Sequence, residues 1–88
     1  MKALLPVATG NEEIEFCALV DVLRRARIDV TVASVEACEM VVLQQGLRIV
    51  PDAKLENVAN EAWDAIAMPG GVPGAMNLGA SELLKSII

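Results

Sequence analysis

Residues 3–16 read ALLPVATGNEEIEF, and this stretch decides the fold because it passes from a buried strand into a helix. Residues 3–8 are apolar without alternation, which is typical of a strand inside a parallel sheet. Pro6 is awkward in such a strand because it gives up a ladder donor. The following helix is predicted over about residues 12–27, with Asn11 as its N-cap.

Three carboxylates lie within four residues of the predicted helix start, and Glu15 is the one that points to chemistry. Negative charge in the first turn is favourable by roughly 0.3–1 kcal/mol, which accounts for Glu12 and Glu13. Steps of three and four residues from Glu15 give an apolar line that is predicted to face the core: Ala18, Leu19, Val22 and Ala26. A carboxylate above that line, beside like charges, should have a raised pKa, as a general acid or base requires. The same periodicity fits equally well a Glu15 that is simply a first-turn acid exposed to solvent.

Composition excludes several classes of protein. The chain has 88 residues, 55% of them hydrophobic, and a formal net charge of −5, so it allows one small domain and argues against a nucleic-acid partner. No apolar run reaches the length of a membrane-spanning helix. Two unevenly placed cysteines form no disulfide framework, so a cytoplasmic location is expected. The lack of histidine excludes Ser–His and Cys–His catalysis within this stretch and removes the commonest zinc ligand, and no cofactor or metal is predicted.

The middle of the chain predicts a parallel α/β unit with a hairpin. Residues 28–35 are rich in β-branched side chains and complete a βαβ unit. Residues 40–43 and 47–50 are predicted to form a hairpin. Residues 54–61 predict a short helical or irregular crossover, and residues 63–68 predict another buried strand.

The last residues predict a helix without a proper end. Ser81 is the expected N-cap of this helix, after a single helical turn over residues 75–78. The helix stops at Ile88 with no C-cap glycine. We therefore expect residues 1–88 to be the N-terminal portion of one larger domain, truncated within a helix.

Two loops are expected to meet at the ligand-binding edge of the sheet. In an open α/β sheet, ligands bind beyond the carboxyl ends of the strands, where residues 9–15 and 69–74 both lie. Their convergence would place Glu15 near free backbone amides of Gly70 and Gly71. Such amides could hold an oxyanion, because glycine lets a ligand approach the backbone. Taken alone, the Pro-Gly-Gly sequence is more simply a tight turn.

The two cysteines are not predicted to be catalytic. Cys17 lies two residues from Glu15, about 200° around the helix, so the two side chains face opposite ways. We expect Cys17 to be a small packing residue and Cys38 to be a loop thiol.

Several motifs follow one another in a specific order along all 88 residues. They are EEIE at 12–15, VDVLRRA at 20–26, VTVA at 30–33, PDA at 51–53, and MPGG at 68–71 with GA at 74–75. In this combination they resemble the ThiJ/PfpI superfamily, and within it the DJ-1-like branch of protein deglycases and glyoxalase III-type enzymes. The resemblance implies a flavodoxin-like three-layer α/β sandwich with a mainly parallel sheet, about twice this length, that forms a homodimer.

The resemblance also implies the parts of a site. A nucleophilic cysteine would follow on a strand-to-helix elbow beyond residue 88, and neither cysteine of this chain matches it. Glu15 corresponds to the family's acid that hydrogen-bonds the cysteine sulfur. Gly71 corresponds to an oxyanion-hole amide, with Gly70 beside the substrate. Gln45 stands where the family often brings an arginine from the partner subunit, and Val50 stands where some relatives have a cysteine.

The function implied by the resemblance is that of a cysteine-dependent enzyme. It would act on methylglyoxal, a small aldehyde, or on its glycated adducts in oxidative and carbonyl stress. The alternative is a non-enzymatic redox-sensing or chaperone-like homodimer. The superfamily's peptidases need a histidine, which this stretch does not supply. The 88-residue chain alone is expected to be inactive.

Overall fold

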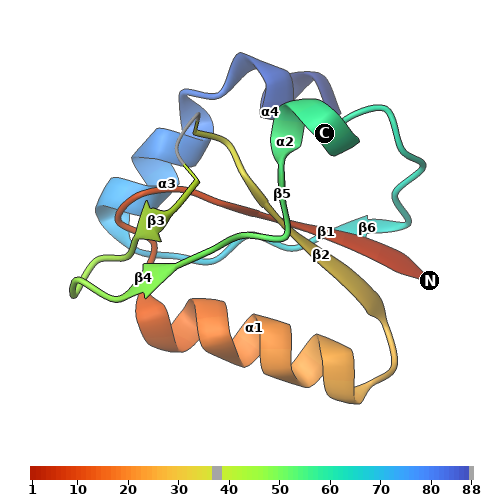
Figure 1. Cartoon of the computed structure of the whole chain (residues 1–88), viewed down its shortest axis with the longest axis horizontal. Helices are drawn as coiled ribbons and strands as arrows, with labels where there is room; N and C mark the ends of the chain where they lie inside the picture. The colour runs from red at the N-terminus through yellow and green to blue at the C-terminus, as the bar shows by residue number, and fades with distance from the viewer. Residues whose placement is uncertain (37–38, 88) are drawn as a thin grey trace.

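The computed structural model describes residues 1–36 and 39–87, and a parallel sheet lies between helices (Figure 1). The elements are β1 (Lys2–Val7), α1 (Glu13–Arg25), β2 (Asp29–Ser34), β3 (Val41–Val42), β4 (Arg48–Ile49), β5 (Ala53–Lys54), α2 (Leu55–Val58), β6 (Ala65–Ile66), α3 (Val72–Gly79) and α4 (Glu82–Ile87). Among the described residues no helix is long and apolar enough to cross a membrane.

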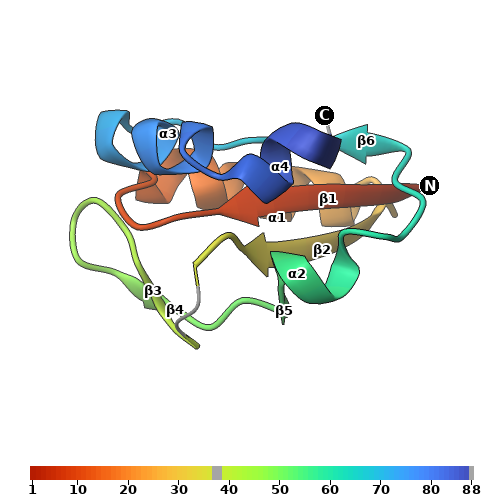
Figure 2. The same cartoon turned by 90° about the horizontal axis from the view of Figure 1, so that it is seen from above.

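The main sheet has the strand order β5-β2-β1-β6, and every pair in it is parallel. Strands β1 and β2 run side by side (Figure 2), from the pair Lys2 and Asp29 to the pair Val7 and Ser34. The predicted βαβ unit and mainly parallel sheet are therefore confirmed. Strand β5 was not predicted, because its two residues form a strand only by pairing with Ala33 and Ser34.

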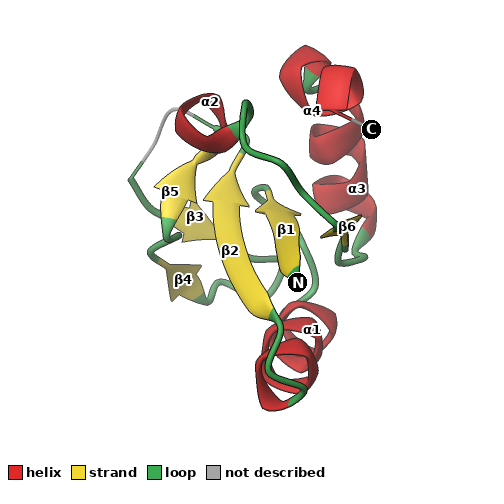
Figure 3. Cartoon of the chain, turned by 90° about the vertical axis from the view of Figure 1, so that its right-hand side faces the viewer, coloured by secondary structure: helices red, strands yellow, loops and turns green. Residues whose placement is uncertain are grey.

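Side chains that alternate along β1 build two cores, one on each face of the sheet. Ala3, Leu5 and Val7 pack with Phe16 of α1 and with the hairpin. Leu4 packs on the other face with residues of α2, α3 and α4. Figure 3 shows α1 on the opposite side of the strands from α4. This arrangement gives the three layers of a flavodoxin-like sandwich.

The apolar line below Glu15 does not face the core, so that prediction is wrong. Ala18, Val22 and Ala26 are exposed, and Val22 is 62% exposed. The buried face follows a second line with the same helical spacing: Phe16, Leu19, Val20 and Leu23. Leu19 belongs to both lines, and the helix is rotated so that the large ring of Phe16 is buried.

The ends of α1 also differ from the prediction. Its N-cap is Glu12, whose Oε2 accepts a hydrogen bond from the Glu15 amide at 2.7 Å. Asn11 is not the cap, because its side chain is used elsewhere. The helix ends at Arg25, and Arg27 adopts a φ of 63°, which stops the helix from continuing.

Strand β6 is shorter and more exposed than the buried strand predicted over residues 63–68. Only Ala65 and Ile66 pair, on the β1 side, and Met68 is 49% exposed. This one-sided pairing also explains how β1 tolerates Pro6. The Leu4 carbonyl accepts from Ala67, and residue 6 faces the same side, where β6 has already ended.

The remaining predictions hold with small changes. Strands β3 and β4 form the hairpin, with Gly46 at a φ of 91° in its turn. The expected turn at residues 75–78 extends into α3, and the crossover contains α2. Ser81 Oγ accepts from the Leu84 amide at 3.1 Å, which confirms the cap of α4. Cys38 and Ile88 lie outside the described residues.

The core predicts a strong effect of Leu5→Ala on stability. Leu5 is fully buried against α1, so the loss of its side chain should lower the free energy of unfolding by about 2–5 kcal/mol. Urea denaturation measures the change. Val50→Ala is the control at an exposed apolar residue, since Val50 is 80% exposed, and its expected change is within about 0.5 kcal/mol.

Candidate active site

The loop after β1 and the loop after β6 meet at the carboxyl ends of these strands, as predicted. The Glu12 amide donates to the Gly70 carbonyl at 2.9 Å. The Asn11 side chain crosses the same junction, where Nδ2 donates to the carbonyls of Pro69 at 3.2 Å and Gly70 at 3.0 Å. Three hydrogen bonds therefore join the two loops.

Asn11 is the residue that sequence reasoning missed. Its side chain is fully buried, and its Oδ1 accepts from the Ala8 amide at 2.8 Å. One carboxamide thus holds its own loop through its oxygen and the facing loop through its nitrogen. The available signal was a polar residue directly between a buried strand and a helix, but a cap would give the same signal.

Glycine allows the two loops to approach this closely. A Cβ atom on Gly74 would overlap Asn11, including its backbone N and Nδ2. Gly71 has a φ of 96°, and a Cβ there would lie 2.7 Å from both the Glu12 N and the Gly10 O. Any larger residue at either position would force the loops apart.

Glu15 reaches the junction from the first turn of α1. A Cβ atom added to Gly70 would lie 2.5 Å from Glu15 Oε1 and 2.8 Å from Oε2, so the carboxylate lies directly over this glycine. The structure therefore brings Glu15, Gly70 and Gly71 together. The side chain is exposed, however, and the expected burial above a core stripe is wrong.

The backbone amides of Gly70 and Gly71 donate no hydrogen bond to any residue that the structure describes. Gly71 is also the N-cap residue of α3, and the positive end of that helix therefore lies at the same place. Unused N–H groups at a helix start suit negative charge. The arrangement can hold an oxyanion beside a carboxylate.

Glu13 has a different task from Glu15. Its Oε2 accepts from the backbone amides of Gln45 at 2.6 Å and Leu47 at 3.3 Å, while its Oε1 is buried with no partner among the described residues. Two backbone bonds support this contact, from Gly10 to Val42 and from Gln44 to Asn11. Glu13 thus holds the turn of the hairpin against α1.

A second asparagine holds the β1 loop from α3. Asn77 Nδ2 donates to the Thr9 carbonyl at 2.7 Å. Thr9 in turn donates to Glu36 through its amide at 2.7 Å and its hydroxyl at 2.8 Å. These contacts join the ends of β1 and β2 without touching the two glycines.

Cys17 is exposed, so the prediction of a packing residue is wrong. The rotation that buries Phe16 turns its neighbour outward. Cys17 lies in a shallow depression on the exposed face of α1 with Ile14, Ala18 and Asp21.

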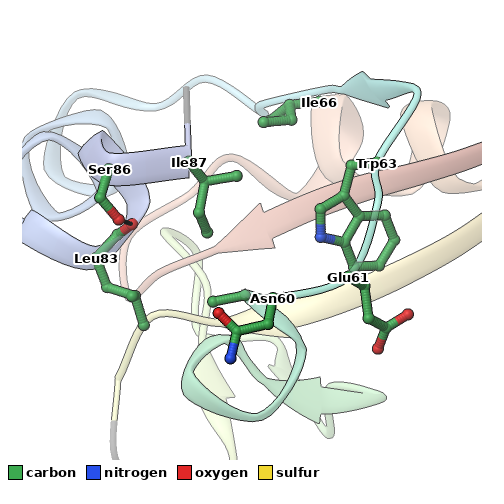
Figure 4. A pocket seen from close by; sticks show the side chains of 8 residues that line it. Asn60, Glu61, Trp63, Ile66, Leu83, Ser86 and Ile87 are labelled. Atoms are coloured by element: carbon green, nitrogen blue, oxygen red, sulfur yellow. Dashed lines mark hydrogen bonds between the residues drawn. The ribbon is translucent and has the colours of Figure 1, made fainter.

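A further cavity lies away from this junction. Its volume of about 350 Å³ is lined by residues that precede β6, by Ile66 of β6 and by residues of α4, among them Trp63 and Leu83 (Figure 4). Since it adjoins the segment before β6, it is not at the carboxyl ends of the strands, where ligands bind in open α/β sheets. The cavity is separate from the candidate site.

Several known proteins are similar to this chain in sequence and fold. Protein dj-1beta of Drosophila melanogaster is 41% identical over 86 residues, which are 98% of this chain and 46% of that protein. Glutathione-independent glyoxalase DJR-1.2 of Caenorhabditis elegans is 42% identical over 79 residues, 85% of this chain and 41% of that protein. The solved structure "Toxoplasma gondii DJ-1, oxidized" matches with a TM-score of 0.95 and 44% identity, over 98% of this chain and 47% of that one.

Fold and site define an open parallel α/β sandwich in which two loops meet at the carboxyl ends of β1 and β6. The model of the DJ-1/PfpI family matches residues 1–88, and the chain belongs to this family. The predicted resemblance is confirmed. The chain spans about half the length of several matched relatives, 46% of the fruit-fly protein and 47% of a zebrafish one.

Gly71→Ala should destabilise the protein, because a methyl group at a φ of 96° would also contact the Glu12 N and the Gly10 O. We expect a loss of about 1–3 kcal/mol in the free energy of unfolding, measured by urea denaturation. Gly79→Ala is the control, because its Cβ would have nothing within 4 Å. That variant should be unchanged or more stable by up to about 1 kcal/mol. Equal effects of the two variants would contradict the close-contact explanation.

Proposed function

We propose that residues 1–88 are the N-terminal portion of a DJ-1-like enzyme of the glyoxalase III or protein deglycase type. The substrate would be methylglyoxal or its adducts. The observation that carries the proposal is the carboxylate of Glu15 over Gly70, next to the unused amides of Gly70 and Gly71. The nematode relative named as a glyoxalase supports the same chemistry.

The proposed reaction begins with a cysteine thiolate from the part of the domain beyond residue 88. Its sulfur adds to the aldehyde carbon, and the electron pair of the C=O double bond moves to oxygen. The Gly71 amide donates to that oxyanion, and Gly70 lies beside the substrate. Glu15 shuttles the proton that neutralises this oxyanion. As an exposed carboxylate beside the two glycines, it reaches the substrate and has access to water.

The whole protein is proposed to work in the cytoplasm, where a reactive cysteine stays reduced. Two of the three acids at the start of α1 already have structural partners, since Glu12 caps α1 and Glu13 holds the hairpin. Glu15 is the acid of the three that remains available for a substrate. This division supports its assignment as the proton shuttle.

Glu15→Gln in the full-length protein should lower kcat/KM for methylglyoxal by about 10²–10⁴-fold, because the amide cannot carry the proton. Steady-state kinetics measures the effect. Glu82→Gln, at an exposed first-turn acid of α4, is the matched control and should leave the rate unchanged. Activity of the Glu15 variant within about threefold of wild type would contradict its assignment as the proton shuttle.

The alternative is a redox-sensing or chaperone-like homodimer. One matched structure is described as oxidized DJ-1, which favours redox chemistry in that relative. Peroxide treatment of the full-length protein, together with the turnover assay, separates the two functions. Sulfinate formation in peroxide-treated full-length protein, seen by mass spectrometry without methylglyoxal turnover, would support the alternative.

A homodimer is part of the proposal, and the exposed face of α1 supports it. Ile14 is 76% exposed beside Cys17 and Ala18, and the hairpin held by Glu13 adds Leu47, which is 47% exposed. Contiguous apolar surface of this kind marks interaction sites. A second copy is the occupant that the family membership favours.

Ile14→Glu should therefore weaken self-association, because it places a charge in the apolar face. Analytical ultracentrifugation of the full-length protein should show at least about a tenfold rise in the dimer dissociation constant. Met76→Glu is the control, since Met76 is 71% exposed on α3, on the other side of the sheet. If the dimer dissociation constant of the Ile14 variant equals that of wild type, this face is not the dimer interface.

A further inference from the structure

We propose that Asn11 is a positioning residue that sets the direction of the Gly70 and Gly71 amides. Its buried carboxamide would hold two neighbouring peptide planes so that both N–H groups face the crevice. The inference rests on the proposed function, since it explains how the donor assigned to the oxyanion is kept in place.

The amide of Asn11 is satisfied in one orientation only. Its Oδ1 accepts from the Ala8 amide at 2.8 Å, and its Nδ2 donates to the carbonyls of Pro69 and Gly70 at 3.2 and 3.0 Å. The Ala8 N–H can only donate, and the two carbonyls can only accept. A flipped carboxamide would therefore lose all three bonds. Asn11 is completely buried, and water does not compete for these groups.

The peptide geometry converts these bonds into a direction. The described residues contain no cis peptide bond, and in a trans peptide the C=O and the next N–H point in opposite directions. The Pro69 carbonyl faces Asn11, so the Gly70 N–H faces away from it. The Gly70 carbonyl faces Asn11 and the Glu12 amide, so the Gly71 N–H also faces away.

Without this hold, only the Glu12 amide would oppose rotation of these planes, and it contacts one of them. Glycine has no Cβ to oppose rotation of the Gly70–Gly71 peptide. After a flip, the Gly70 carbonyl would point to the place where the Gly71 N–H now points. A carbonyl there would repel an oxyanion instead of stabilising it. The Glu12 amide alone holds one of the planes, whereas Asn11 holds both.

The residue type is specific to this task. Aspartate has the size of asparagine and can still accept from Ala8, but as a carboxylate it cannot donate to Pro69 or Gly70. Its second oxygen would instead attract the Gly71 N–H, which favours the flipped peptide. Asn11→Asp thus removes the donor and keeps the shape. Asn11→Ala removes the donor without adding charge, and serves if the aspartate variant fails to fold.

The test uses the full-length protein with Asn11→Asp and a matched control, Asn77→Ala. Asn77 also holds the β1 loop through one amide donor, at the Thr9 carbonyl, but touches neither glycine peptide. We expect Asn11→Asp to lower kcat for methylglyoxal by about 10²–10³-fold, the loss typical of one oxyanion donor, with KM changed less than about threefold. Asn11→Ala should lose at least about tenfold in kcat, and Asn77→Ala less than about threefold. Crystal structures should show the Gly70–Gly71 peptide flipped in the aspartate variant and wild-type in the control.

Each outcome decides the inference. A flipped peptide with lowered kcat supports it; an unflipped peptide, or a flipped one with kcat within about threefold of wild type, overturns it. Equal losses in the Asn11 and Asn77 variants would also overturn it, since they would reflect loop stability alone. If the wild-type protein does not turn over methylglyoxal, the proposed function fails separately. The peptide direction in the wild-type and variant crystals then decides the positioning role.

Discussion

The hydrogen bonds of the Asn11 carboxamide are the contact on which the candidate site depends. They join a loop after β1 to a loop after β6 across fifty-eight and fifty-nine positions of the chain. A buried amide of this kind is favourable only when every donor and acceptor is satisfied, and here each is. The two loops therefore have one preferred separation, and the position of Glu15 over Gly70 follows from it.

The three acids at the start of α1 show how one sequence pattern serves different physical tasks. Glu12 folds back on its own helix, and Glu13 accepts from two amides of the hairpin. Of the three, Glu15 is the acid whose carboxylate lies over Gly70. The helix dipole stabilises all three negative charges. Their roles differ because each carboxylate has different hydrogen-bond partners.

The order of strands and the meeting of the two loops could be predicted because apolar runs and glycines act locally. The apolar runs over residues 3–8 and 28–35 indicated buried strands, and the glycines after residue 68 indicated a loop at the end of a strand. The rotation of α1 could not be predicted, because Leu19 lies on two apolar lines with equal spacing and the choice depends on where Phe16 fits. Strand β5 and the role of Asn11 depend on partners far along the chain, which no local pattern reveals.

The contact of backbone with backbone at Gly71 and Gly74 has a consequence for how such a site can diversify. Substrate preference in enzymes is usually altered by exchanging side chains that line the pocket. At this corner the wall is bare main chain, packed too closely for a side chain to be added. The polar groups of this main chain stay the same whatever side chains surround them, so any change in ligand preference would have to come from residues on other elements.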